Sequence, residues 1–336
     1  MRPITTISAA GLSRSEFEAI TIRRDPAVLK GLGAGWSIVK AAATGDEGLC
    51  DYIAQRAVEE MQDVLIAPTS AKGLFSYTEG LNGRNFDRRR VPLKGFLDQL
   101  LQLRTAADAP AVYIQSTPAP QIMLGFATEN INLLIDDAIE PRLWIGNATR
   151  VAAHFDVADN LAIVAAGRRR FILFPPEQVN NLYVGPLDFT PAGQPISLVD
   201  PEAPDFTRFP LFHDAMSSAQ IAELEPGDAI YIPSPWWHYV AALSPVNLLV
   251  NYWWRDYPAA CGTPFNWLVH GLLTMRHLPK AERDAWRAII DHYVFEDSGD
   301  PAAHIPEAAR SVLGPMTPDL AAHLSNWLGK QFKPPS

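Results

Sequence analysis

The spacing of hydrophobic and polar residues changes twice along the chain and predicts three regions. Between Leu143 and Trp254, short apolar runs are separated by Pro/Gly turns, which is typical of strands in a β core. Residues 1–110 mix helical spacing with short extended segments, and beyond residue 260 the spacing becomes helical. We therefore predict a mainly β core over residues 111–260, flanked by an N-terminal α/β region (1–110) and C-terminal helices (261–336).

Individual elements follow from the same patterns. Apolar residues four apart predict a helix from Asp46 to about Leu65, and Pro92 suits the first position of a second helix. Residues 25–30 and 111–116 are predicted strands. In the C-terminal region, helical spacing over residues 280–293 and a Thr317-Pro318-Asp319 start signal predict two more helices.

Composition and charge restrict the class of protein. The 29 prolines and 21 glycines among 336 residues agree with many turns, and a hydrophobic content of 48% suffices for a large core. A formal charge of −9 argues against a general nucleic-acid binder. Two arginine triplets, Arg88–Arg90 and Arg168–Arg170, are local exceptions, and we predict a solvated turn for the first.

Cysteine usage and the N-terminus indicate the compartment. Cys50 and Cys261 form no CxxC pair, which fits a reducing environment. The N-terminal residues lack the apolar segment of a signal peptide, and no apolar run reaches the roughly 18 residues of a membrane helix. We expect a cytoplasmic protein that is not inserted in a membrane.

Three residues in two predicted strands could bind one metal ion. His154 and Asp156 are two residues apart, so in a strand their side chains point to the same face. A third ligand, His238, would come from the stretch Pro226–Val240. Two imidazoles and one carboxylate suit a non-haem Fe(II) centre with open coordination positions. A His-x-Asp tripeptide alone is weak evidence, and the surrounding strand and turn signals strengthen it.

The order of motifs around these residues resembles the cupin-like JmjC oxygenases. It runs from His154-Phe-Asp156 through Asn160 and Gly167–Pro176 to Trp236-Trp-His238 and then Asn251-Tyr-Trp. Within that family the pattern is most similar to the asparaginyl hydroxylase that inhibits hypoxia-inducible factor and its bacterial relatives. The resemblance implies a double-stranded β-helix (jelly roll) that uses Fe(II), 2-oxoglutarate and molecular oxygen for hydroxylation.

The resemblance also implies roles for individual residues. Tyr113 would lie at the 2-oxoglutarate carboxylate, with Asn160, Arg169 and Asn251 also around the cosubstrate, while Gln115 and Trp237 would lie near the substrate. Relatives carry lysine where this chain has Arg169, a departure that preserves the positive charge. They carry threonine where this chain has Val151, and valine cannot make the hydrogen bond that threonine makes to the cosubstrate carboxylate. Without the resemblance, Tyr113 and Gln115 are interpreted as residues of a half-buried edge strand. The side-chain amides of Asn160 and Asn251 are then interpreted as hydrogen-bonding to the backbone at a bulge or a strand end.

Strand parity separates the arginines of the second triplet. Because side chains alternate, Arg169 points opposite to Arg168 and Arg170, and the motif selects Arg169 for the interior. An inward arginine needs an anion, since a buried unpaired charge is costly. The long proline-rich stretch 184–216 is predicted to be a lid or an insert.

Alternatives stay open at this level. A metal-binding cupin with a non-oxidative activity such as an isomerase would need the three metal ligands but not Asn160, Arg169 and Asn251 together. A non-catalytic binding barrel would not need the metal ligands, and their intact set argues against it. The substrate is a protein, a peptide or a small molecule, and lysine demethylation is a further option. The C-terminal apolar stripe (Leu320, Leu324, Trp327, Leu328, Phe332) predicts a homodimer, or else it packs on the chain's own core.

Overall fold

The chain forms two units, which we describe separately. The computed structural model describes residues 1–257 and 259–332. Contacts divide the chain into Met1–Trp254 and Arg255–Ser336.

The first unit contains two sheets that are antiparallel except for the pairs β1–β12, β2–β3 and β5–β9. The larger sheet has the order β2 (Thr5–Ser8), β3 (Ala27–Lys30), β13 (Ala229–Ile232), β10 (Asp159–Ala166), β15 (Asn247–Trp254), β8 (Arg142–Gly146), β7 (Ala111–Pro118), β4 (Met61–Ala67), β6 (Asp87–Pro92). The smaller sheet has the order β1 (Arg2–Pro3), β12 (Gln220–Leu224), β11 (Arg169–Phe174), β14 (Trp237–Ala242), β9 (Arg150–Phe155), β5 (Leu74–Phe75).

Four strands of each sheet face one another as the predicted double-stranded β-helix. β8, β15, β10 and β13 come from the larger sheet, and β9, β14, β11 and β12 from the smaller one. On β10, Ala162 and Val164 point into the space between the sheets, whereas Leu161 and Ile163 point to the outer, helix-covered core. Because both faces of β10 are covered, all eight of its residues are buried.

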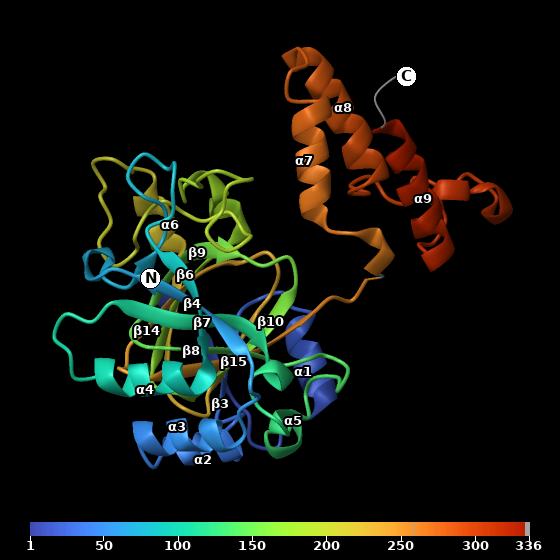
Figure 1. Ribbon diagram of the computed structural model, residues 1–336. Coiled ribbons are helices and arrows are strands. Elements are labelled where there is room, and N and C mark those ends of the chain that lie inside the picture. Colours follow the sequence, from blue (N-terminus) through green and yellow to red (C-terminus); the bar gives the residue numbers. More distant parts are fainter. Residues whose placement is uncertain (258, 333–336) are drawn as a thin grey trace. The chain divides into compact units, whose positions relative to one another are not determined.

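Helices cover the outer face of the larger sheet, as Figure 1 shows for α2, α3 and α4. Their apolar residues, such as Ile38, Ile53 and Phe96, form one core cluster with the sheet. Ser13 caps α1 because its hydroxyl accepts from Glu16 N while the Glu16 carboxylate accepts from Ser13 N. The helices of this layer are α1 (Arg14–Thr21), α2 (Ser37–Ala42), α3 (Asp46–Gln55), α4 (Leu93–Leu103) and α5 (Phe126–Glu129).

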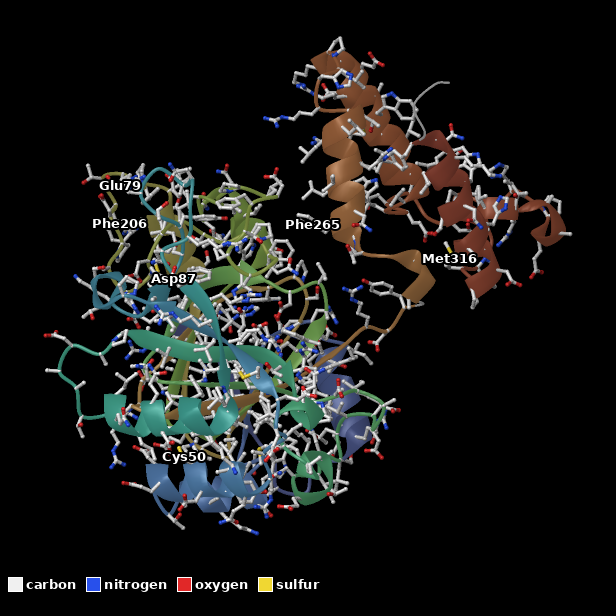
Figure 2. The ribbon with its side chains drawn as sticks, in the orientation of Figure 1. Cys50, Glu79, Asp87, Phe206, Phe265 and Met316 are labelled. Carbon is white, nitrogen blue, oxygen red and sulfur yellow. The ribbon has the colours of Figure 1, made fainter. Side chains whose placement is uncertain are left out.

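An insert between β11 and β12 covers the smaller sheet. It ends in α6 (Phe212–Ser218), and Phe212 packs against Phe174 of β11. Ser197 N donates to Ala153 O over 2.7 Å, and Ile196 forms a bridge with His154, so the insert pairs with β9. Two ion pairs add to this attachment: Arg150 NH1 to Asp200 Oδ2 (2.7 Å) and Arg170 NH1 to Glu202 Oε1 (2.9 Å). In Figure 2 the loops carrying Glu79 and Phe206 lie at the same end of the core.

Two sequence predictions in the N-terminal region are wrong. The helix predicted from Asp46 to Leu65 ends at Gln55, and β4 begins at Met61. Pairing of β4 with both β6 and β7 outweighs the four-residue spacing, and Met61 is exposed rather than part of a helical stripe. The Arg88–Arg90 triplet forms the edge strand β6 instead of a turn.

The second unit is helical, as predicted. α8 spans Lys280–Tyr293, and Thr317 caps α9 (Pro318–Gln331) by accepting from Leu320 N. α7 (Pro264–Thr274) precedes them. Among the described residues, no helix is both long enough and apolar enough to span a bilayer. Short 3-10 turns lie at Thr69–Ala71, Ala119–Gln121, Pro176–Asn180, Ala259–Cys261, Glu307–Ala309 and Ser311–Leu313.

Candidate metal centre

The three predicted metal ligands meet between the two sheets. His154 lies on β9, Asp156 directly follows that strand, and His238 is paired with His154 across β9 and β14. The two imidazole centroids are 4.3 Å apart, and His238 Nε2 lies 3.6 Å from Asp156 Oδ2. One ligand atom from each residue lies within 4.8 Å of the others, and the described residues contain no other such group of His, Cys, Asp or Glu.

Backbone carbonyls orient both imidazoles. His154 Nδ1 lies 2.9 Å from Ala152 O, and His238 Nδ1 lies 3.1 Å from Trp236 O. A carbonyl can only accept, so each Nδ1 carries a proton and donates it to the carbonyl. Burial, assisted by the neighbouring His154, lowers the pKa of His238 to about 4, although Asp156 acts in the opposite direction. His238 is therefore a neutral imidazole at pH 7, the form that binds metals.

Two hydrogen bonds hold the Asp156 carboxylate. Trp253 Nε1 donates to Oδ2 over 3.0 Å, and Asn160 Nδ2 donates to the same oxygen over 3.3 Å. Asn251 lies beside them and accepts from Trp144 Nε1 over 2.8 Å. The two asparagines singled out in the sequence thus lie next to the metal ligands. No role was predicted for Trp253, although it belongs to the Asn251-Tyr-Trp motif.

The donor set fits Fe(II). Two imidazoles and one carboxylate would hold an ion from one side and leave its remaining positions open to the space between the sheets. Partners that fix the orientation of metal ligands are typical of such sites, and each of the three ligands has one here.

A narrow cavity of about 40 Å³, the inner cavity, extends from the metal ligands to Arg169. Arg169 is paired with Ala242, four positions along β14 from His238, which is about 13 Å in a strand. Its side chain is buried, and its Nε has no hydrogen-bond partner among the described residues. Burial lowers the pKa of Arg169 to about 10, so it remains a cation at neutral pH. A buried cation without a counterion at the end of a cavity fits a carboxylate ligand.

The neighbouring arginines point elsewhere. Arg170 pairs with Glu202 and Glu223 on the outside of the sheet, and Arg168 is exposed. Val151 lies in the wall of the inner cavity and offers no hydrogen bond there. The assignment of Arg169 to the cosubstrate stays a prediction.

A wider cavity of about 270 Å³, the outer pocket, adjoins the metal ligands. Gln115 and Ser116 contribute polar groups from β7, and the insert contributes Gln194. Asp156 is the charged side chain in its lining. Burial raises the pKa of Tyr113, so this hydroxyl stays protonated. Five aromatic rings line the outer pocket: Phe75, Phe86, Tyr113, Trp144 and Trp253.

The structure does not bring Trp237 to either cavity. Trp237 precedes His238 on β14, so its side chain points to the opposite face. There it packs against Phe155 at a centroid distance of 4.9 Å, in the core between the smaller sheet and the insert. The predicted contact of Trp237 with substrate therefore needs correction. Phe75 and Phe86, which the sequence did not indicate, lie in the outer pocket instead.

An ion pair connects the segments that carry the ligands. The Arg24 guanidinium binds Asp159 with both NH groups, at 2.6 and 2.8 Å, and Asp159 also accepts from Ser234 N. Ser234 Oγ in turn donates to Asp156 O over 2.8 Å. Trp236, whose carbonyl orients His238, donates its indole N–H to Arg24 O. These contacts tie Asp156 and the segment before His238 to one another.

We expect Asp159→Asn to lower both stability and Fe(II) affinity. The Asp159 side chain is 6% exposed and that of Arg24 49%, so the free energy of unfolding should fall by about 1–3 kcal/mol. Fe(II) affinity should fall about tenfold, as for other partners of metal ligands. Urea unfolding and anaerobic Fe(II) titration measure the two effects.

Asp228→Asn is the matched control. Asp228 is also buried, pairs with half-exposed Lys30 at 2.7 Å and accepts from backbone N–H groups, but it has no contact with the ligand segments. It should lose stability and keep its Fe(II) affinity. Equal Fe(II) affinity in both variants would rule out a positioning role for Asp159.

The chain belongs to the cupin-like domain family, whose sequence profile matches residues 13–260. That span contains the β-helix, the three metal ligands and both cavities.

Three relatives of the chain have names that describe different activities or partners. The chain is 25% identical over 272 residues to tRNA wybutosine-synthesizing protein 5 of Gallus gallus, covering 76% of this chain and 78% of that protein. It is 35% identical over 116 residues to human HSPB1-associated protein 1, covering 34% of this chain and 23% of that protein. It is 23% identical to Lysine-specific demethylase JMJ31 of Arabidopsis thaliana, covering 73% of this chain and 49% of that protein. The chain thus spans less than half of the last two proteins.

Proposed function

We propose that this protein is an Fe(II)- and 2-oxoglutarate-dependent oxygenase that hydroxylates a substrate bound in the outer pocket. The observation that carries the proposal is Arg169, a buried cation in the cavity that begins at the metal ligands, with no counterion among the residues that the structure describes. 2-Oxoglutarate has an oxo-carboxylate at one end, which suits the metal, and a second carboxylate at the other, which suits Arg169.

Iron with 2-oxoglutarate and oxygen supplies the oxidising chemistry, in which one oxygen atom enters the new hydroxyl and the other enters succinate, with release of CO₂. The residues of this chain bind and orient. His154, Asp156 and His238 would hold the ion, and Trp253 and Asn160 fix the carboxylate of Asp156 by hydrogen bonds. Tyr113 lies in the outer pocket, where its protonated hydroxyl can donate a hydrogen bond.

The lining of the outer pocket favours a neutral target group. Its aromatic rings and the amides of Gln115 and Gln194 suit an apolar or amide-bearing side chain or a planar ring. Asp156, its one charged side chain, would be occupied by the metal, so a cation would find no carboxylate in the lining.

Succinate release tests the proposal. Protein loaded anaerobically with Fe(II) should, once oxygen is admitted, convert 2-oxoglutarate to succinate faster in the presence of substrate. Screening should cover peptide, metabolite and tRNA pools, because the names of the relatives point to protein and tRNA. Asp156→Ala is the control and should release none above background. A loaded protein that neither binds 2-oxoglutarate nor forms succinate would favour the non-oxidative cupin.

We also propose a homodimer formed by the second unit. Among its described residues, the buried apolar side chains are Pro301, Ala302 and Ala321, which are all small, whereas Trp267, Leu273 and Trp327 are exposed. Light scattering should give twice the chain mass for the full protein and a single chain mass for a shorter form ending at Ser311. A full-length monomer would contradict this proposal.

A further inference from the structure

The edge strand β6 leaves one of its sides without a partner. It is the last strand of the larger sheet, and β4 is its neighbour within that sheet. Outside this strand pair, no described residue makes a backbone hydrogen bond to residues 87–91. Asp87, the first residue of β6, marks this edge in Figure 2. Its outward N–H and C=O groups can therefore pair with a further strand.

The same strand carries an unusual positive charge. Arg88, Arg89 and Arg90 are consecutive and exposed in a chain whose formal charge is −9. Arg90 lies 3.9 Å from Asp63, and the described residues contain no ion pair of Arg88 or Arg89. Charged side chains on an edge strand are often present merely to prevent self-association, so the arginines alone do not indicate a binding site.

The strand register supplies a second observation. Arg88 is paired with Leu65 on β4, and Leu65 is paired with Tyr113 on β7. Leu65 and Tyr113 both line the outer pocket, as does Phe86, two residues before Arg88. Arg88 and Arg90 therefore share the pocket-side face of the sheet. Arg89 is paired with Val64 and has the opposite, helix-side face.

We propose that the edge of β6 binds an acidic polypeptide segment in extended conformation, which adds a strand to the sheet and delivers a neighbouring residue to the outer pocket. This inference rests on the proposed oxygenase function and gives its substrate class. Backbone pairing supplies affinity in this mode of recognition, and alternate side chains supply specificity. Acidic side chains two residues apart would face Arg88 and Arg90 together.

A polypeptide fits this edge better than a nucleic acid does. The backbone of β6 presents alternating donors and acceptors, which an extended peptide matches, whereas phosphate oxygens only accept. The net negative charge of the chain also opposes a dense polyanion. A strand advances about 3.3 Å per residue, so the target residue should lie within about six positions of the acidic pair.

Fluorescence anisotropy with a labelled eight-residue peptide of alternating Glu and Val tests the proposal on the full-length protein. The peptide should bind, and the Arg88→Glu/Arg90→Glu double variant should weaken it about tenfold, as the reversal of two exposed ion pairs implies. Arg89→Glu is matched with the single variant Arg88→Glu, because the two make the same charge change on opposite faces, and it should weaken binding less than Arg88→Glu does. Circular dichroism and thermal unfolding establish that each variant is folded.

Three further probes separate strand addition from simple charge attraction. The same peptide with methyl groups on alternate backbone nitrogens should not bind, and neither should a Lys-Val peptide. A twelve-nucleotide single-stranded RNA should bind more weakly than the Glu-Val peptide. The proposal would be overturned if the Glu-Val peptide did not bind, or if its methylated form bound equally well. It would also be overturned if Arg89→Glu weakened binding as much as Arg88→Glu does, or if the RNA bound more tightly than the peptide.

Binding is measured without iron or 2-oxoglutarate, so it does not depend on turnover. Asp156→Ala should bind the Glu-Val peptide as the parent does. Peptide binding without any succinate formation would contradict the proposed oxygenase function and leave the proposed strand addition standing. Succinate formation without peptide binding would contradict the strand addition and leave the oxygenase function standing.

Discussion

Replacing His154, Asp156 or His238 with alanine should abolish tight Fe(II) binding. The three side chains converge within 4.8 Å of one another, so each removal leaves only two protein ligands. Loss of an outer partner of a metal ligand already costs 10–100-fold in affinity, so loss of a ligand itself should cost more than about 100-fold. Anaerobic titration with Fe(II), followed by iron analysis after desalting, gives the affinity and the stoichiometry, which we expect to be one ion per chain.

Four other histidines serve as controls: His213, His270, His277 and His292. Within the part of the chain that the structure describes, none of them belongs to a group of three side chains that could hold a metal. Their alanine variants should keep the iron content of the parent. If all three ligand variants kept it as well, iron would be bound elsewhere and the site would be wrong.

Arg169→Ala should weaken 2-oxoglutarate binding by about 2–4 kcal/mol, which is roughly 30- to 900-fold, because a charge-assisted contact in a buried cavity is lost. Fe(II) affinity should not change. Titration of 2-oxoglutarate into the Fe(II)-loaded protein, followed by the metal-to-ligand charge-transfer band, measures the affinity. Arg168→Ala and Arg170→Ala should bind almost like the parent, since both side chains lie outside the cavity.

Arg169→Met adds a readout that does not need the cosubstrate. Without bound cosubstrate, the buried charge of Arg169 has no counterion among the described residues, so an apolar side chain of similar length should raise the Tm. The parent should gain thermal stability from 2-oxoglutarate, and Arg169→Met should not. A variant with lower Tm and unchanged cosubstrate affinity would assign Arg169 to structure alone.

The sequence predicted the parts of the site that depend on local rules. Strand alternation is sufficient to place His154 and Asp156 on one face and to set Arg169 opposite to Arg168 and Arg170, whereas the family motif was needed to select Arg169 for the interior. Strand alternation would also have shown that Trp237, adjacent to His238, points away from the metal. The resemblance to a family outweighed that local rule, and the rule was the better guide.

What the sequence did not predict depends on pairing between distant segments. β4 forms because β6 and β7 lie on either side of it, and nothing within residues 61–67 indicates those partners. Phe75 and Phe86 reach the outer pocket for the same reason. The Arg24–Asp159 ion pair joins residues 135 positions apart, and one sequence without an alignment holds no signal for it.

The insert that covers the smaller sheet also forms part of the outer pocket, through Gln194 and Ile196. Ile196 bridges to His154 itself, and Ser197 N donates to the carbonyl of Ala153. A molecule that enters or leaves by displacing this segment must break hydrogen bonds of the strand that carries a metal ligand. Displacement of the insert would therefore disturb the strand that carries His154, and in Fe(II)-loaded protein the absorption spectrum of the metal should change when the outer pocket opens at this segment.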